Sequence, residues 1–598
     1  MNARTWSMDE VEAQVCRCLV KAPAETPAFP PATLYLDLAE SVVRQATAWQ
    51  TPEGMIGDPY NEPGVESVTA TARYAAALGH LLATGRCQDL LEAASCAMDW
   101  CCNDMTDHWE RGTNWPCAVF NMKDLLVLFE ALEPFEAARR YANWGAQLRA
   151  PRPEACYFGT RNYLFYGLAA ETLRIRLGLS DRVDYIDRVI EEERQWWTDH
   201  GMYRDPGDPA TYDLTVRQCL AFMVENGYNG RHQEWGHEML RKGTLTALLF
   251  VSPTGVAPCG GRSNQFHHLE GMIAYAAEHQ AKTAWREGRR ALAGALRGTA
   301  LAAAEAAGRW MLRDPYNCTK NLMASQPFFG QDGFGETQNA HSGYGLLAAN
   351  LFAGAYRVAD QQIPPATPPS HVGGYVTYLP DAFHRLWATA GDYHIQVDTR
   401  GQDHYDPTGL VRVHRRGVPP AACLNMGIVP NPSYHLPRPR AERAVALGIG
   451  WPTQSGWRYL ASANRDTHRA NIRDVEEGRE VTFGVGYLDQ DGSLGTASVH
   501  EDYHLSPDGL HVTSHVPGAG RVRLQVPLVE TDGEQHSKIS LRKQGVDVSY
   551  RGHTVSISVP KAEASWLEPW PAPNRNGVYR VAVFEGVGSE LSCAVAIT

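Results

Sequence analysis

The stretch CGGRSNQFHH, residues 259–268, gathers polar side chains of several kinds directly before an apolar helical segment. It holds two glycines, a guanidinium, a hydroxyl, two amides and two imidazoles. One polar side chain is enough to cap a helix N-terminus, so capping explains only one member of the set. Because Arg262, Asn264, His267 and His268 combine donors with bases, we take this stretch as the first candidate catalytic site.

Similar polar clusters precede other apolar helical segments, and the first five clusters recur about every 50 residues, as in a helical repeat. The candidate binding residues in them are Glu66, Asn114, Trp115, Arg161, Asn162, Tyr163, Tyr212, Arg217 and His341. Tyr344 follows His341 by three positions, which places both on one helical face. Aromatic residues at helical spacing usually pack in a core, although sugar rings also stack on them, so both interpretations of Trp115 and Tyr163 stay open.

An interval of this length is the size of one helical hairpin, and six hairpins in series predict an (α/α)6 toroid, with an open solenoid as the alternative. In a closed toroid the N-termini of the inner helices point to one end. Helix N-termini present unpaired N–H groups and a partial positive charge. The polar clusters should therefore meet in one cleft that suits an anionic ligand.

The sequence changes character after residue 360. Residues 1–360 show apolar side chains at helical spacing, as in VDYIDRVIEEERQWW at 183–197. The segment QQIPPATPPS at 361–370 is too rich in proline for a helix or a central strand and is predicted to be a linker. Residues 371–598 alternate in the manner of strands and are expected to form an antiparallel β-sandwich domain.

The candidate residues suit β-elimination next to a uronate carboxylate. Asn and Arg donors would stabilise the charge that builds on the carboxylate as the C5 proton leaves. A His or Tyr would remove that proton, and a Tyr or His would protonate the departing glycosidic oxygen. This chemistry needs no metal or organic cofactor, and we predict none.

A helical toroid, a proline-rich linker and a C-terminal antiparallel β domain together resemble the toroid-type polysaccharide lyases, which include the heparinase II/III-like and oligoalginate lyase groups. Those families commonly use Asn or Arg to neutralise the carboxylate, His and Tyr as base and acid, and a cleft beside the β domain. The resemblance implies that this chain is an enzyme, a carbon–oxygen lyase that cleaves a glycosidic bond at a uronic acid.

Carried over by residue, the resemblance implies that Asn264 and Arg262 neutralise the carboxylate, that His267 or His268 is the base, and that Tyr344 is the acid. It also implies subsite roles for the other cluster residues, namely Arg161, Asn162 and His341. The chain departs from the pattern at one point, since Gln265 follows Asn264 where several of these lyases have an Asn-Asn-His or Asn-His sequence.

Two other functions remain open. A toroid glycoside hydrolase, such as a glucuronidase, needs two carboxyl groups across the cleft. The candidate carboxylates are Glu66, Asp213, Glu270 and Glu336. The second alternative is a protein that binds glycans without catalysis, because a fold alone does not decide function.

The remaining features limit the partners. The net charge of −12 comes without a basic run, which argues against nucleic acid and membrane surfaces and leaves an anionic oligosaccharide or polysaccharide as the expected substrate. The odd number of cysteines, 13, and a first segment without the apolar core of a signal peptide favour a cytoplasmic protein. The ten-residue spacing of four histidines is not a zinc signature; they are His384, His394, His404 and His414.

Overall fold

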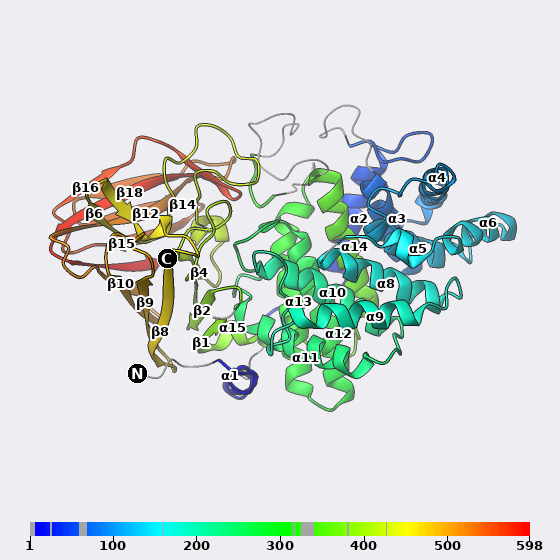
Figure 1. Ribbon diagram of the computed structural model, residues 1–598, viewed down its shortest axis with the longest axis horizontal. Coiled ribbons are helices and arrows are strands. Elements are labelled where there is room, and N and C mark those ends of the chain that lie inside the picture. The colour runs from blue at the N-terminus through cyan, green and yellow to red at the C-terminus, as the bar shows by residue number, and fades with distance from the viewer. Residues whose placement is uncertain are drawn as a thin grey trace.

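The structure is a computed structural model that describes residues 6–598 except 24, 26, 59–67, 160, 315, 317–318, 324–339, 380–381 and 426. Its first part is helical and its second part consists of antiparallel sheets (Figure 1). The predicted order, helices before strands, is therefore confirmed. No helix in the described ranges is both long and apolar enough to cross a membrane.

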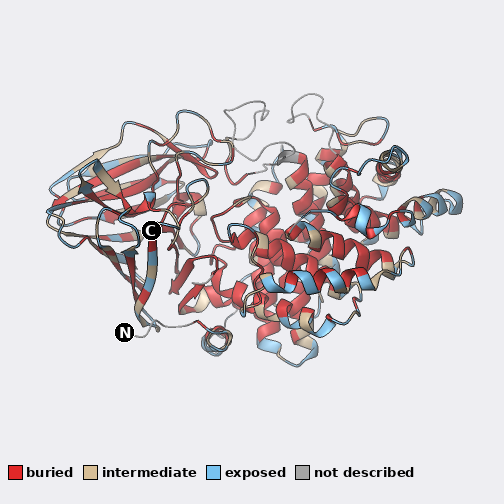
Figure 2. Ribbon diagram, in the orientation of Figure 1, coloured by how far each residue is buried: buried red, intermediate tan, exposed pale blue. Residues whose placement is uncertain are grey.

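The helical part contains an inner group of helices that contact one another in cyclic order. The helices are α1 Met8–Lys21, α2 Leu34–Thr47, α3 Val68–Ala83, α4 Leu91–Glu110, α5 Ala118–Leu132, α6 Ala138–Arg149, α7 Pro153–Cys156, α8 Asn162–Arg176, α9 Val183–Glu193, α10 Ala210–Glu225, α11 Gln233–Phe250, α12 His268–Arg286, α13 Arg290–Met311, α14 Gly345–Val358 and α15 Pro369–Val372. The inner helices α3, α5, α8, α10, α12 and α14 follow one another in contact, and α14 returns to α3. They are buried over most of their length, whereas outlying helices such as α6 expose a face (Figure 2).

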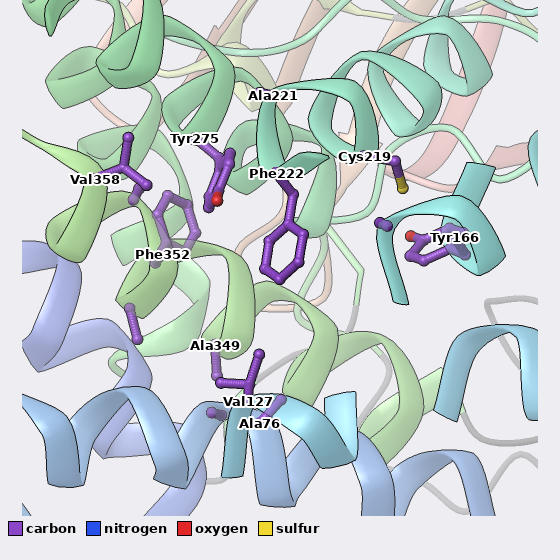
Figure 3. Packing of buried hydrophobic residues seen from close by; sticks show 14 of the residues in the cluster. Ala76, Val127, Tyr166, Cys219, Ala221, Phe222, Tyr275, Ala349, Phe352 and Val358 are labelled. Carbon is purple, nitrogen blue, oxygen red and sulfur yellow. The ribbon is translucent and has the colours of Figure 1, made fainter. Parts of the chain in front are cut away.

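Small residues let the inner helices approach closely. A Cβ atom added at Gly79 of α3 would lie 2.8 Å from the Cα atom of Leu128 in α5, so only glycine fits this crossing. Ala76, Val127 and Ala349, from three inner helices, meet in the interior (Figure 3). Burial of such apolar side chains, about 1.5–3 kcal/mol for each large one, is the main stabilising contribution.

The described residues of the β part form three antiparallel sheets. The first has the order β1-β2-β3-β4-β5, the second β13-β14-β15-β19-β11-β10-β9-β8 and the third β16-β18-β12-β6-β7, with β17 paired to β18. The strands are β1 Gly373–Leu379, β2 Arg385–Ala390, β3 Tyr393–Asp398, β4 Gly409–Arg415, β5 Leu424–Asn425, β6 Gly448–Thr453, β7 Gly456–Tyr459, β8 His468–Glu476, β9 Val481–Asp489, β10 Ser498–Ser506, β11 Gly509–His515, β12 Arg521–Thr531, β13 Lys538–Arg542, β14 Gly545–Tyr550, β15 His553–Ser558, β16 Ala564–Leu567, β17 Ala572–Asn574, β18 Gly577–Val587 and β19 Glu590–Ile597. Side chains from all three sheets share one apolar core.

The two parts are joined by more than the linker. The proline-rich segment packs on α13, where the backbone N–H of Ala366 donates to the carbonyl oxygen of Gly294 at 2.8 Å. Trp6 belongs to residues 1–360, the segment predicted to be helical, but it packs in the core of the β part. Its indole N–H donates to the carbonyl oxygen of Val376 at 2.9 Å, and its ring meets that of Tyr378 edge-on. These contacts hold the sheets against the helical part.

Candidate active site

A cavity of about 150 Å³ lies at the N-terminal end of the inner helices. Its wall is formed by Arg73, Phe120, Asn162, Tyr163, Tyr166, Thr211, Tyr212, Thr215, Ser263, His268, Leu269, Met272, Tyr344 and Leu347. Every inner helix contributes to this wall, mostly from its first turns. Because helix N-termini carry partial positive charge, the cavity favours an anionic ligand.

His268 and Tyr344 form the aromatic side of the cavity. Their rings stack with centroids 5.0 Å apart, and Phe266 lies 4.7 Å from Tyr344. Burial, and next the nearby charge of Arg73, hold the pKa of His268 well below its ordinary value. The imidazole is therefore neutral at pH 7, and its Nδ1 atom has no hydrogen-bond partner among the described residues. A neutral imidazole in this position can accept a proton.

The opposite side of the cavity is organised by a buried carboxylate, Asp205. Its Oδ1 atom accepts from the backbone N–H of Asn162 at 3.2 Å and from the side-chain amide of Asn162 at 2.8 Å. Its other oxygen forms an ion pair with Arg262. The guanidinium of Arg262 lies over the ring of Tyr212, 4.4 Å from its centroid. Asp205 thereby fixes an amide that lines the cavity and a cation behind it.

The loop before α12 is held in place by the β part. The backbone N–H of Gly261 donates to both carboxylate oxygens of Asp406 at 2.9 Å, and Arg385 donates to the same carboxylate at 2.7 Å. A Cβ atom at Gly260 would lie 2.5 Å from the Arg385 guanidinium, and one at Gly261 would lie 2.3 Å from the Cβ atom of Pro209. The two glycines of the CGGRSNQFHH stretch are therefore required by close packing and by their positive φ angles.

A second contact from the β part reaches the end of this loop. The guanidinium of Arg575, in the turn between β17 and β18, donates to the carbonyl oxygen of Asn264 at 2.8 Å. It also lies over the rings of Phe266 and Tyr434, at 5.1 and 3.8 Å from their centroids. The sheets thus fix the backbone that leads into His268.

The structure brings five of the candidate residues to the cavity wall: Asn162, Tyr163, Tyr212, His268 and Tyr344. Three others lie close by without lining it. Arg262 is paired with Asp205, Arg161 stacks on Trp196 with its guanidinium carbon 3.1 Å from the ring centroid, and Asn264 is fully buried behind the loop.

Several candidates lie away from the cavity. The ring of His267 turns to Trp310, 6.2 Å between centroids, because neighbouring residues of a helix point in different directions. Trp115 is buried and its indole N–H donates to Asp104 at 2.7 Å, while Asn114 is exposed. Arg217 forms a buried ion pair with Asp213. The geometry therefore favours structural roles for Trp115 and Arg217.

Two candidates cannot be placed on the cavity wall. Glu66 lies outside the described residues, and so does the side chain of His341, which belongs to a π-helical turn over Ala340–Tyr344.

The carboxylates that a hydrolase would need are not at the described cavity wall. Asp213 is buried beside Arg217, and Glu270 is buried beside Lys320 with 2.6 Å between the charged atoms. Glu66 and Glu336 lie outside the described residues. Among the described residues, the wall therefore carries one formal charge at neutral pH, the positive charge of Arg73.

Sequence reasoning missed Arg73 and Asp205. Arg73 is a lone cation in the apolar stretch VTATARYAAALGH, where no acidic residue stands within one helical turn to pair with it. That isolation was a usable signal. Asp205 belongs to the polar run YRDPGDPATYDL at 203–214, and nothing in its spacing distinguishes it from the neighbouring Asp208.

The described residues do not hold a group of three or more metal-ligating side chains. His394 and His414, two of the four evenly spaced histidines, bond to other groups: Nδ1 of His394 to Thr389 at 2.9 Å and Nδ1 of His414 to Ser252 at 2.8 Å.

The comparisons with known proteins concern the fold. No protein family matches the sequence, and no curated protein is significantly similar to it. A crystal structure of heparinase III superposes with a TM-score of 0.52 at 9% identity, covering 99% of this chain and 90% of that one. Weaker matches include a chondroitinase AC lyase, with a TM-score of 0.43, 10% identity and coverage of 98% and 82%, and a chondroitin lyase of a baculovirus envelope, with 0.46, 10% and coverage of 99% and 84%. The chain therefore shares its overall fold with heparinase III.

Proposed function

We propose that the protein is a polysaccharide or oligosaccharide lyase that cleaves a glycosidic bond at a uronic acid by β-elimination. One observation carries the proposal: the described cavity wall combines a neutral imidazole stacked on a phenol, an amide and one guanidinium, without a carboxylate. This is the set that β-elimination requires and that two-carboxylate glycoside hydrolysis does not use. The shared fold with heparinase III agrees with it.

The proposed reaction assigns His268 as the base. It takes the proton from C5 of the uronate, the electron pair of that bond forms the C4–C5 double bond, and the bond from C4 to the glycosidic oxygen breaks. Tyr344, stacked on His268, gives its proton to the departing oxygen. The products are an unsaturated uronate and a shortened chain with a new hydroxyl group.

The amide of Asn162 takes the neutralising role that the resemblance gave to Asn264. Asn162 lines the cavity, whereas Asn264 is buried behind the loop. One hydrogen of the Asn162 amide is bound by Asp205, and no described residue accepts the second, which can donate to a ligand. A donor fixed before the substrate arrives stabilises developing charge without reorganisation.

The cavity size favours one sugar unit at the reacting position. Its volume of about 150 Å³ lies below the range of about 300–1,000 Å³ of pockets for drug-sized ligands. Tyr163, 43% exposed at the cavity wall, offers a ring on which a further sugar can stack. The (α/α)6 toroid and β-sandwich expected from sequence would place this cavity at the junction of the two domains.

The test is incubation with a panel of uronate-containing glycans. We expect ultraviolet absorbance from the conjugated unsaturated uronate, in step with new reducing ends. New reducing ends without that absorbance would indicate a hydrolase. Binding without either signal would indicate a protein that only recognises the glycan.

A further inference from the structure

Arg73 is a cation that substrate can reach and that the described residues leave without a counter-charge. It lines the cavity from the second turn of α3, and its Nη1 atom donates to the carbonyl oxygen of Gly343 at 2.7 Å. Among the described residues no carboxylate forms an ion pair with it, whereas Arg262 is paired with Asp205 and Lys320 with Glu270. An uncompensated guanidinium in a partly buried cavity favours a bound anion.

Arg73 also acts on the base. Its guanidinium carbon lies 5.7 Å from the centroid of Tyr344, whose ring stacks on His268. Among the described residues, the other charged or titratable groups that lower the pKa of His268 are the adjacent His267, Lys320 and Arg575. Lys320 is partly offset by Glu270, and neither Lys320 nor Arg575 belongs to the cavity wall. Arg73 is therefore the neighbouring charge that a bound sugar can cancel.

We infer that Arg73 couples recognition to catalysis: the carboxylate of a uronic acid binds Arg73 inside the cavity, and this same contact makes His268 competent to take a proton from the sugar. The inference rests on the proposed function, because it uses His268 as the base. It deepens that function by naming the residue that selects the uronate carboxylate, Arg73, and the group on which this selection acts, His268.

The sign of the effect follows from electrostatics. A positive guanidinium disfavours a second positive charge on the imidazole and lowers the pKa of His268. A bound carboxylate cancels the charge of Arg73, so the pKa of His268 rises towards the working pH, where a base is most effective. A neutral sugar leaves Arg73 charged and His268 a weak base. The carboxylate and guanidinium only pair, and the proton that moves is the one from C5.

The recognition step can be tested without turnover. Binding of the methyl glycosides of glucuronic acid and of glucose is compared by ligand-observed NMR for the wild type, Arg73→Gln and Arg73→Lys. Arg176→Gln is the matched control. Arg176 is the last residue of the inner helix α8, and it pairs with Glu130 at the end of the inner helices that lies away from the cavity. We expect the wild type and the control to prefer the uronate by about 10- to 100-fold, the worth of a charged hydrogen bond.

Arg73→Gln should abolish that preference and Arg73→Lys should retain part of it. A preference that persists in Arg73→Gln overturns the inference. If the uronate preference depends on Arg73 but no glycan is cleaved, recognition stands and the lyase assignment fails. The two failures are therefore distinguishable.

The coupling step is read from pH profiles of turnover. The acid limb of kcat/KM reports the base in the free enzyme, and that of kcat reports it in the substrate complex. We expect the kcat limb of the wild type to lie at higher pH than the kcat/KM limb. Arg73→Gln should move the acid limb of kcat/KM to higher pH and close the gap. Arg73→Lys keeps the charge and should preserve the gap. The lysine variant therefore provides a test even if Arg73→Gln folds poorly. An equal gap in wild type and Arg73→Gln would contradict the coupling.

Discussion

The inner helices form a cavity at each end, and the two cavities differ in whether the charges of their walls are paired. The far cavity, about 190 Å³, lies where these helices end and includes Glu130, Glu225 and Arg357 in its wall. Its carboxylates are paired, Glu130 with Arg176 and Glu225 with Lys282, both at 2.7 Å. The cavity at the N-terminal end carries the charge of Arg73 without a described counter-ion.

The inner helices form a hollow at each end, and the loops and charges around each hollow distinguish the two. At the N-terminal end, the loop before α12 is fixed by Asp406 and Arg575 of the β part, and helix dipoles add positive charge. At the far end, the last turns of the inner helices carry charges that pair with one another, Glu130 with Arg176 and Glu225 with Lys282.

The two ends each hold a buried imidazole, which permits a matched substitution. The pKa values of His268 and His80 both lie well below the ordinary value because of burial. We expect His268→Gln to lower kcat by about 10²–10⁴-fold or more, the range for loss of a general base. His80→Gln should leave kcat unchanged, because His80 lies in the wall of the far cavity.

The rate at which the unsaturated product forms measures the activity of both variants, and thermal unfolding shows whether they fold. Equal losses in the two variants, or full activity of His268→Gln, would remove the distinction between the cavities.

The buried carboxylate at the active end provides the second test. Asp205→Asn should lower kcat by about 10–100-fold, because it removes the charge of the carboxylate that positions Asn162 and Arg262 and so weakens both of these bonds. Glu130→Gln removes an ion pair at the far end and should leave turnover unchanged.

A double variant separates positioning from general destabilisation. If Asp205 acts through Arg262, then Asp205→Asn combined with Arg262→Gln loses little more activity than either alone. Losses that simply multiply would show that the two residues act independently.

A buried acid far from the active cavity should affect stability and not turnover. Glu501 in β10 accepts from Tyr503 at 2.6 Å and from Ser514 at 3.2 Å, and burial raises its pKa to about 7. Between its unfolded pKa, about 4.3, and 7 the folded state keeps the proton that the unfolded state has lost, so stability falls as pH rises through this window.

Glu501→Gln should remove this part of the pH dependence, with unfolding midpoints recorded from pH 4 to 8 and turnover unchanged. Glu476→Gln, an exposed position of the same sheet, is the control. A pH dependence that Glu501→Gln leaves intact would show that this carboxyl ionises normally in the folded protein.

Sequence reasoning reached the order of the two parts and the meeting of several polar clusters, because helical and strand periodicities and the repeat interval are local signals. It could not choose between His267 and His268, since that choice depends on where α12 begins and which side of the helix faces the cavity. The pairing of Asp213 with Arg217 was available from their spacing of four residues.

Other features depended on contacts between distant segments. The need for Gly260 and Gly261 arises from Arg385 and Pro209, and the partner of Asn162 lies 43 residues away in Asp205. No local pattern encodes such contacts, so the positioning residues emerged only from the structure.

The fate of the glycosidic oxygen tests the central claim most directly. The protein is incubated with the uronate glycan that it cleaves, in water labelled with the heavy oxygen isotope. The masses of the products are then measured by mass spectrometry. Elimination at the His268 cavity predicts product masses that sum to the substrate mass, an unsaturated uronate without label, and product formation slowed by about 10²–10⁴-fold or more with His268→Gln. One labelled oxygen at each new reducing end would mean that water attacks the bond and would contradict the account.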